Sequence, residues 1–238
     1  MIDELVAGAL EQAGRRNSAE IRHVAGLVLG AIRSDALVFT AGAGHSLASV
    51  AETFYRAGGL ACVYPLYHPD LLPLHGAAAS TAAERRAGLA AEVLASGSAP
   101  GPSDVVVVFS NSGVNPYPVE LAEAARAAGA QVVAVTSRAS VEAAPRRSHT
   151  TLPEQADVVL DTGVRPGDAA FPAGSPRTVA LSSLLNVYLW NEVLAHVCTT
   201  AEQEGVEVPL WRSSNVEGGD AANASLLEHY RPRVPALR

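Results

Sequence analysis

A stretch near the middle of the chain, Asp104 to Ser137, constrains the fold more than any other. Val105 to Phe109 is an unbroken run of β-branched and aromatic residues, which is typical of a strand buried on both faces of a parallel sheet. A helix is expected next, with Pro118 in its first turn and Gly129 at its end. Gln131 to Thr136 is predicted to be the following strand. The stretch therefore predicts a strand, a loop, a helix and a second parallel strand.

Two polar loops follow predicted strands and precede predicted helices. Ser110-Asn111-Ser112-Gly113 gathers hydroxyls and backbone N–H groups where a helix is about to begin, and such a place stabilises an anion. The second loop, Ala41 to Ser46, lies between a predicted strand, Ala36 to Thr40, and a helix predicted from Leu47 to Ala57. Ligands of doubly wound sheets bind beyond the carboxyl ends of the strands. We predict an α/β fold, a three-layer α-β-α sandwich around a mostly parallel, doubly wound sheet.

Neither loop has a common nucleotide-binding pattern. Gly42-x-Gly44 is present, but the third glycine of a dinucleotide fingerprint is replaced by Leu47, and no Gly-Lys-Ser/Thr follows. Hydroxyls and N–H groups can hold a phosphate without a lysine. The alternative is that the serines cap helices and the glycines turn the chain. That reading suffices for either loop alone, and for the two loops together we favour a phosphate site.

The bulk composition is that of one globular domain. The chain has 238 residues, a net charge of −7 and two cysteines, Cys62 and Cys198. The negative charge argues against general nucleic-acid binding, and two cysteines suit a reducing cytosol. The N-terminus is acidic where a signal peptide would be basic, and no apolar run reaches the length that spans a bilayer. We expect a cytoplasmic protein with neither a nucleic-acid nor a membrane partner.

The motifs Gly42-x-Gly44-x-Ser46 and Ser110-x-Ser112-Gly113 together resemble the sugar isomerase (SIS) domain of phosphosugar-binding proteins. The resemblance covers roughly residues 35–200. It implies a single SIS domain with a flavodoxin-like sheet, in which helices at 1–34 precede a core at 35–200 and a tail at 201–238. The likeness extends to a less characterised bacterial branch, whose marks in this sequence are FYRAGG (54–59), SNSGVNPYP (110–118), GDAA (167–170) and SSNVEGGDAAN (213–223).

The resemblance also implies which residues bind the substrate phosphate. They come from both loops and their borders: Gly44, Ser46, Ser110, Asn111, Ser112, Gly113 and Asn115. Many family members have threonine at the position of Asn115.

SIS enzymes mostly move a proton at the carbon next to a sugar carbonyl. That step needs a carboxylate or imidazole base, and a donor to the developing enediolate oxygen. Glu52 is placed first, because it lies on the non-core side of its predicted helix; the alternative is a surface ion pair with Arg56. The full set of candidates is Glu52, His45, His75, Glu84, Glu192 and His196.

A long apolar helix is predicted at 178–198, and its polar residues fall in one half of the helical wheel: Ser182, Ser183, Asn186, Glu192 and His196. These polar groups belong either to a subunit interface or to the wall of an active site, and SIS domains commonly combine the two. We expect a homodimer, with Ser182 and Glu217 as sugar-binding residues. His68, Asp70 and His75 match no known metal-ligand spacing, so neither a metal nor another cofactor is expected.

The resemblance implies proton abstraction at C2 of a sugar phosphate. With an N-acetylhexosamine 6-phosphate, C2 carries an amide, which blocks isomerisation and favours loss of the C3 hydroxyl. We lean to such a lyase (dehydratase) of amino sugar metabolism. The alternatives are an aldose–ketose sugar-phosphate isomerase and a non-catalytic phosphosugar sensor, although neither a DNA-binding domain nor a basic patch is evident for the sensor.

Other expectations concern the rest of the chain. Two helices are predicted in residues 1–33, separated near Gly14 to Ser18, with Ser18 capping the second. We further expect a strand at Leu60 to Tyr64, one helix from Ala77 to Ser96, an exposed mobile segment at 138–153, a strand at Ala156 to Asp161, a loop from Thr162 to Arg177, and a tail helix capped by Asp220.

Overall fold

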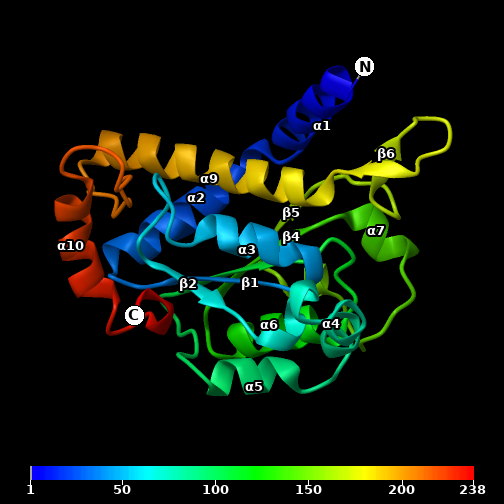
Figure 1. Cartoon of the computed structure of the whole chain (residues 1–238), viewed down its shortest axis with the longest axis horizontal. Helices are drawn as coiled ribbons and strands as arrows, with labels where there is room; N and C mark the ends of the chain where they lie inside the picture. The colour runs from blue at the N-terminus through cyan, green and yellow to red at the C-terminus, as the bar shows by residue number, and fades with distance from the viewer. Residues whose placement is uncertain (1) are drawn as a thin grey trace.

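The computed structural model describes residues 2–238, and this part of the chain contains a five-stranded sheet whose neighbouring strands are all parallel (Figure 1). The strand order is β2-β1-β3-β4-β5, which is that of flavodoxin-like sheets. The predicted α/β sandwich is confirmed. The strands are β1 (Val38–Gly42), β2 (Val63–Leu66), β3 (Val105–Phe109), β4 (Gln131–Thr136) and β5 (Val158–Asp161).

Helices cover both faces of this sheet. One face is covered by α2 (Ser18–Arg33), α3 (Leu47–Thr53) and the long α9 (Ser182–Glu204), which packs on α2 and α3 (Figure 1). The opposite face is covered by α6 (Pro116–Ala127), on which α4 (Ala77–Glu84), α5 (Leu89–Ala95) and α8 (Leu152–Gln155) pack. The other helices are α1 (Ile2–Arg16), which packs on α9, α7 (Arg138–Ala143) and α10 (Gly219–Tyr230).

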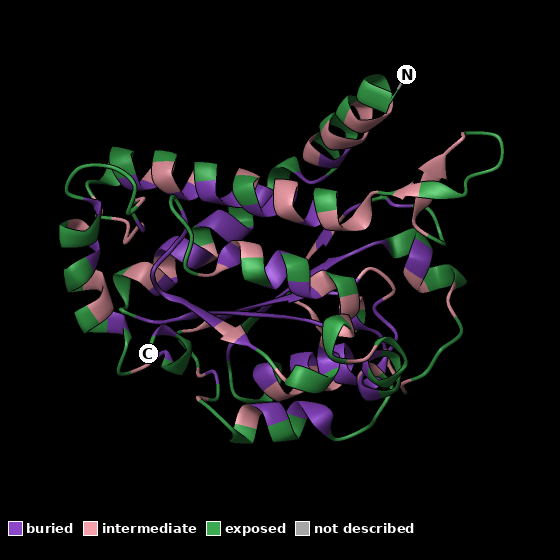
Figure 2. Ribbon diagram, viewed as in Figure 1, coloured by how far each residue is buried: buried purple, intermediate pink, exposed green. Residues whose placement is uncertain are grey.

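The central strand β3 explains why the sheet needs two helical layers. Every residue of β3 is buried, so its side chains are covered on both faces, and the same holds for β1 (Figure 2). A parallel sheet of this kind requires continuous apolar runs, because no strand face is exposed to water. In the register of β3 and β4, Val107 pairs with Val133 and Phe109 with Val135. The largest apolar cluster of the protein therefore lies around β3.

Several predicted element boundaries are wrong because local backbone geometry ends or begins a helix elsewhere. α3 stops at Thr53, since Phe54 is extended and Tyr55 has a positive φ of 45°. By contrast, α6 (Pro116–Ala127) has Pro118 in its first turn and Gly129 just past its end, as predicted. The single helix predicted from Ala77 to Ser96 is two helices, separated at Gly88, which is left-handed (φ 86°) and donates its N–H to the Glu120 carboxylate at 2.8 Å.

Segments predicted to be irregular also contain regular structure. Residues 138–153 include α7, which the Ser137 hydroxyl caps, and the start of α8, which begins with a Thr151–Glu154 capping box. The predicted loop 162–177 contains β6 (Ala169–Phe171), which pairs antiparallel with β7 (Thr178–Ala180). Because β7 occupies the start of the predicted long helix, α9 begins at Ser182 and extends to Glu204. β2 lies at Val63–Leu66, so it begins three residues and ends two residues later than the predicted strand at Leu60 to Tyr64. β5 starts at Val158, two residues later than predicted.

The two N-terminal helices are separated as predicted, but Asn17 and not Ser18 occupies the cap. Asn17 is buried, and its amide donates to the carbonyl oxygens of Ala13 at 2.7 Å and Asp161 at 2.9 Å. Its Oδ1 accepts from the Asp161 N–H at 2.7 Å. One amide thus ties the turn between α1 and α2 to the end of β5, and from this turn α1 projects away from the body of the molecule (Figure 1).

No helix within residues 2–238 combines the length and the apolar character needed to cross a membrane. At the C-terminal end, α10 is preceded by Gly218 at the cap position, where the sequence predicted Asp220.

The two cysteines differ in accessibility. Cys62 is fully buried, and burial raises the pKa of its thiol to about 12, whereas Cys198 is partly exposed. Because the thiolate is the reactive form, we expect a thiol reagent at mildly alkaline pH to modify Cys198 in the folded chain and Cys62 only after unfolding. A chromogenic disulfide assay with and without denaturant measures this, with Cys198→Ser as the control. Equal reaction rates of both thiols in the folded protein would contradict it.

Candidate functional site

The two polar loops meet beyond the carboxyl ends of β1 and β3. These strands are neighbours, and Gly42 pairs with Phe109 at the point where both end. A pocket with a volume of about 400 Å³ opens there. It is lined by both loops, by α4 and the turn before it, and by the start of α9: Ala43, Gly44, His45, Ser46, Pro73, Ala77, Ser80, Thr81, Glu84, Ser110, Asn111, Ser112 and Ser182.

The first loop approaches the start of α3 so closely that a side chain at Gly42 would require Ser46 to shift. A Cβ at Gly42 would lie 3.0 Å from the backbone and the Cβ of Ser46. Gly44 has a φ of 59°, in the left-handed region that favours glycine, and a 3₁₀ turn at Gly44–Ser46 leads directly into α3. The Ser46 hydroxyl has no hydrogen-bond partner among residues 2–238 and lines the pocket.

The second loop is tied to β4 by Asn111. The Asn111 carbonyl oxygen accepts from the Ser137 N–H at 3.1 Å and from the Thr136 hydroxyl at 3.2 Å. Within the loop, the Ser110 hydroxyl accepts from the Gly113 N–H at 3.3 Å. The loop is thus held by a hydrogen bond within it and by bonds to the end of β4. The Ser112 hydroxyl has no partner in the described part of the chain, and Ser112 lines the pocket.

The α4 helix contributes to the wall of the pocket and supplies a carboxylate. The Ser80 hydroxyl donates to the Leu71 carbonyl at 2.8 Å, which anchors α4 to the chain before it. One turn further, Glu84 lines the pocket, and its carboxylate makes no hydrogen bond or ion pair with residues 2–238. His45, from the first loop, lines the same pocket and is exposed. A carboxylate and an imidazole therefore share a pocket with unpaired serine hydroxyls.

The start of α9 reaches this pocket through a cap that the sequence analysis did not identify. The Asp168 carboxylate accepts from the N–H groups of Leu181 (3.0 Å) and Ser182 (2.9 Å), and from the Ser182 hydroxyl at 2.6 Å. Asp168 is also left-handed (φ 65°), which is uncommon for a residue other than glycine. It lies in the GDAA segment, 14 residues before Ser182, so its presence in that segment was the available signal and no local capping pattern indicated the contact. Asp168 positions Ser182 at the pocket.

Eight of the predicted site residues line this pocket: His45, Gly44, Ser46, Ser110, Asn111, Ser112, Glu84 and Ser182. The structure does not bring the others to it. Glu52 forms an ion pair with Arg56 one helical turn away, which is the alternative considered for it. Gly113, the last residue of the second loop, is buried and does not line the pocket, and Asn115, also buried, accepts a bond from Arg147 at 3.3 Å.

The remaining candidates lie on other elements. His75 is exposed in a 3₁₀ turn (Pro73–His75), with its Nδ1 3.2 Å from the Pro69 carbonyl oxygen. Glu192 and His196 are further along α9, where burial and the Glu192 carboxylate raise the pKa of Tyr188. Glu217 is exposed in the tail before α10. Within the described part of the chain, no three His, Cys, Asp or Glu side chains are close enough together to hold a metal ion.

Comparison with known proteins agrees with this geometry. Residues 4–137 match the family model described as the SIS domain. A UPF0309 protein of Listeria monocytogenes is 33% identical over 222 residues, covering 91% of this chain and 89% of that protein. A UPF0309 protein of Brucella canis is 40% identical over 225 residues, covering 93% and 91%.

Solved structures show the same fold. A phosphoheptose isomerase from Neisseria gonorrhoeae matches with a TM-score of 0.51 and 21% identity, over 82% of this chain and 98% of that one. A proposed phosphosugar isomerase from Silicibacter pomeroyi matches with a TM-score of 0.53 and 16% identity, over 86% and 51%.

Proposed function

This chain belongs to the SIS domain family, and we propose that it is an enzyme that binds a sugar phosphate and abstracts the proton at C2 of the sugar. The observation that carries the proposal is that one pocket is lined by Ser46 and Ser112, whose hydroxyls are unpaired within residues 2–238, and by Glu84, whose carboxylate is also unpaired there. A phosphate acceptor site and a base that share one pocket are what such a reaction requires. The isomerase names of structures with the same fold support the same class of substrate.

The substrate phosphate is assigned to the two loops. Ser46 and Ser112 come from adjacent loops beyond β1 and β3, and both hydroxyls can donate to phosphate oxygens. Asn111 lines the same pocket, but its carbonyl and its side chain are engaged with Thr136, Ser137 and Thr162. Its role in the proposal is therefore to hold the loop, with the serines making the contacts to the ligand.

Glu84 replaces Glu52 as the proposed base, because Glu52 is paired with Arg56 outside the pocket. In the open-chain sugar, the Glu84 carboxylate takes the proton from C2. The electrons of that C–H bond form a C1–C2 double bond, and the C1 carbonyl oxygen becomes anionic. His45, in the same pocket, is the proposed donor to this oxygen.

Elimination is the proposed outcome for an N-acetylhexosamine 6-phosphate. The C1 carbonyl re-forms, a C2–C3 double bond is made and the C3–O bond breaks, so that the hydroxyl leaves as water with the proton that Glu84 took from C2. An amide at C2 leaves no hydroxyl to become a ketone, which is why elimination competes well with isomerisation. The second candidate is aldose–ketose isomerisation of a sugar with a C2 hydroxyl, which the names of the structural neighbours favour.

We expect Ser46→Ala and Ser112→Ala each to weaken the binding of the sugar phosphate about tenfold or more. A hydrogen bond to a charged group contributes roughly 1.5–3 kcal/mol, and each change removes one donor. Isothermal titration calorimetry with glucosamine 6-phosphate and N-acetylglucosamine 6-phosphate measures the loss. Ser225→Ala, an exposed serine on α10, serves as the control. Unchanged affinity in both pocket variants would remove the loops from phosphate binding.

Glu84→Gln is expected to abolish proton exchange at C2 while leaving sugar-phosphate binding within a few-fold of the original. The purified chain is incubated with a panel of hexose and hexosamine 6-phosphates in D₂O and followed by NMR. Deuterium at C2 reports abstraction, and the product separates elimination from isomerisation. Glu52→Gln is the matched control and should retain exchange. Binding without exchange by the original chain would instead support a non-catalytic sensor, and full exchange by Glu84→Gln would exclude Glu84 as the base.

We also propose that the chain forms a homodimer. α1 and the β6–β7 hairpin both project from the body of the molecule (Figure 1), and a hollow of about 320 Å³ between them is lined partly by apolar residues, including Leu5, Ala9 and Leu181. Leu184, on the adjoining turn of α9, is also exposed. A second copy would cover these exposed apolar residues. Trp190 on α9 is an aromatic residue of a kind common in interfaces, but it is buried in the core of the chain and is not part of the proposed interface. Light scattering should give twice the 24.5 kDa chain mass, and an active monomer would contradict the proposal.

A further inference from the structure

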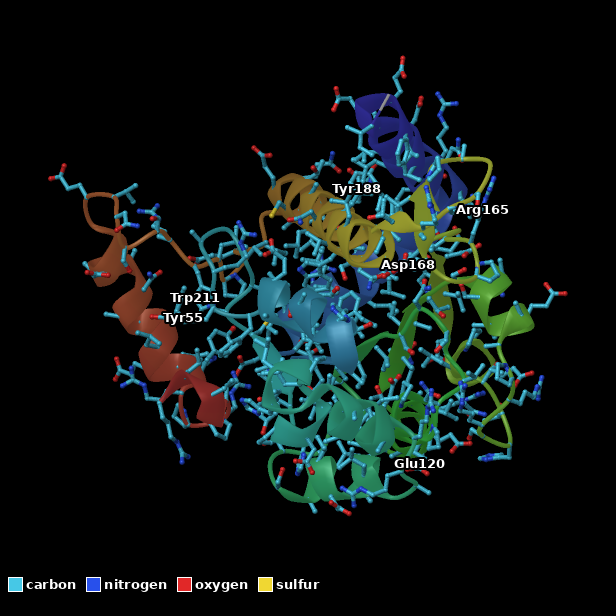
Figure 3. All side chains as sticks on the ribbon, turned by 45° about the vertical axis from the view of Figure 1, so that its right-hand side comes forward. Tyr55, Glu120, Arg165, Asp168, Tyr188 and Trp211 are labelled. Carbon is cyan, nitrogen blue, oxygen red and sulfur yellow. The ribbon has the colours of Figure 1, made fainter. Side chains whose placement is uncertain are left out.

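A second pocket lies at the opposite end of α3 from the serine loops. Ser46 precedes α3, whereas Tyr55 follows it, and the two pockets share no lining residue. The second pocket has a volume of about 250 Å³. Its walls come from the segment after α3 and from the tail: Tyr55, Arg56, Ala57, Trp211, Arg212, Ser213, Ser214, Asn215 and Asn223. In Figure 3, the side chains of Tyr55 and Trp211 lie together beside α10.

Backbone bonds hold these two segments together. The Gly58 N–H donates to the Trp211 carbonyl at 2.8 Å, and the Trp211 N–H donates to the Gly59 carbonyl at 2.9 Å. Next to them, Leu60 and Leu210 form an antiparallel bridge. One segment includes the end of FYRAGG (54–59) and the other leads directly into the tail motif (213–223), and the proposed reaction at the serine loops uses neither motif. Together, the two segments form the wall of the second pocket.

The tail side of the pocket is a tightly built loop. The buried Asn223 side chain accepts from the Arg212 N–H at 2.8 Å and donates to the Arg212 carbonyl at 2.8 Å, as a neighbouring strand would. Gly219 packs so closely on this loop that a Cβ would overlap the Ser213 carbonyl. A loop held in this way presents its side chains in a defined arrangement before any ligand arrives, and such preorganisation lowers the cost of binding.

The aromatic pair in the pocket carries unusual features. Tyr55 is left-handed (φ 45°), yet 53% of it is exposed, so the conformation does not serve to bury the ring. Its ring meets Trp211 edge-on, with 5.0 Å between the centroids. Trp211 is buried, and its indole N–H has no acceptor among the described residues, which is rare for a buried donor.

The remaining lining groups are mostly hydrogen-bond donors. The Arg212 guanidinium, the Ser214 hydroxyl and the Asn215 amide have no partner within residues 2–238, and the Arg56 guanidinium is paired with Glu52. We propose that this pocket is a second ligand site, which binds a small acidic sugar. Arg212 would pair with the carboxylate or phosphate, Ser214 and Asn215 would bind hydroxyls, and the sugar ring would lie against Tyr55.

Trp211 offers a reporter for this site, since Trp190 is the other tryptophan of the chain. In a Trp190→Phe variant, glucuronate and glucose 6-phosphate are titrated while the emission of Trp211 is followed, with glucose as the uncharged probe. We expect a saturable change with at least one acidic sugar and none with glucose. The two acidic probes distinguish a carboxylate from a phosphate ligand. Should Trp190→Phe fail to fold, the indole N–H signals of the unmodified chain in NMR provide the same readout.

Variants separate the two sites. Arg212→Ala should weaken the Trp211 response about tenfold or more, and Arg22→Ala, an exposed arginine on α2, should not. Ser112→Ala should leave the response unchanged, so failure of the proposed function at the serine loops would not affect this result. The proposal is overturned if neither acidic sugar changes the Trp211 signal, if Arg212→Ala binds as well as the original chain, or if Ser112→Ala alone removes the response.

Discussion

The carbonyl oxygen of Asn111 accepts two hydrogen bonds, from the Ser137 N–H and the Thr136 hydroxyl, and the organisation of the main pocket depends on them. They join the loop after β3 to the end of β4, so the loop keeps a constant position relative to the rigid centre of the sheet. Because β1 lies directly beside β3, the loop after β1 is brought alongside. The pocket follows from this junction: two loops that end buried strands are held side by side, with their serine hydroxyls left for a ligand.

Much of this could be predicted from the sequence. The bounds of β3 and β4 were predicted correctly, because a strand buried on both faces needs an unbroken apolar run, and Val105–Phe109 and residues 132–135 supply such runs. The loops were recognisable because each gathers glycine and serine residues between a predicted strand and a predicted helix. At Gly42 the close approach of Ser46 disfavours a side chain, which is why glycine at this position indicates a tight turn.

The part of the pocket wall that α4 supplies could not be predicted in the same way. Glu84 is the last residue of α4, and Gly88 turns the chain before α5, a break that a continuous alanine-rich pattern conceals. Glu52 looked better placed, but its neighbour Arg56 was one turn away and the two side chains pair. Asp168 acts on the start of α9 across a hairpin, and a contact between segments separated by a hairpin leaves little trace in local periodicity.

The buried amide of Asn17 holds the N-terminal helix α1 at one end. The amide fixes only the inner end of α1, against Asp161 at the end of β5, and near that end Gly14 lies so close to the Tyr188 hydroxyl that a Cβ there would clash. The helix extends about 22 Å from Asn17, at 1.5 Å per residue, so a rotation of roughly 10° at Asn17 would displace its free end by about 4 Å. The position of the free end of α1 therefore depends on how one buried amide holds its inner end, together with the packing of α1 on α9.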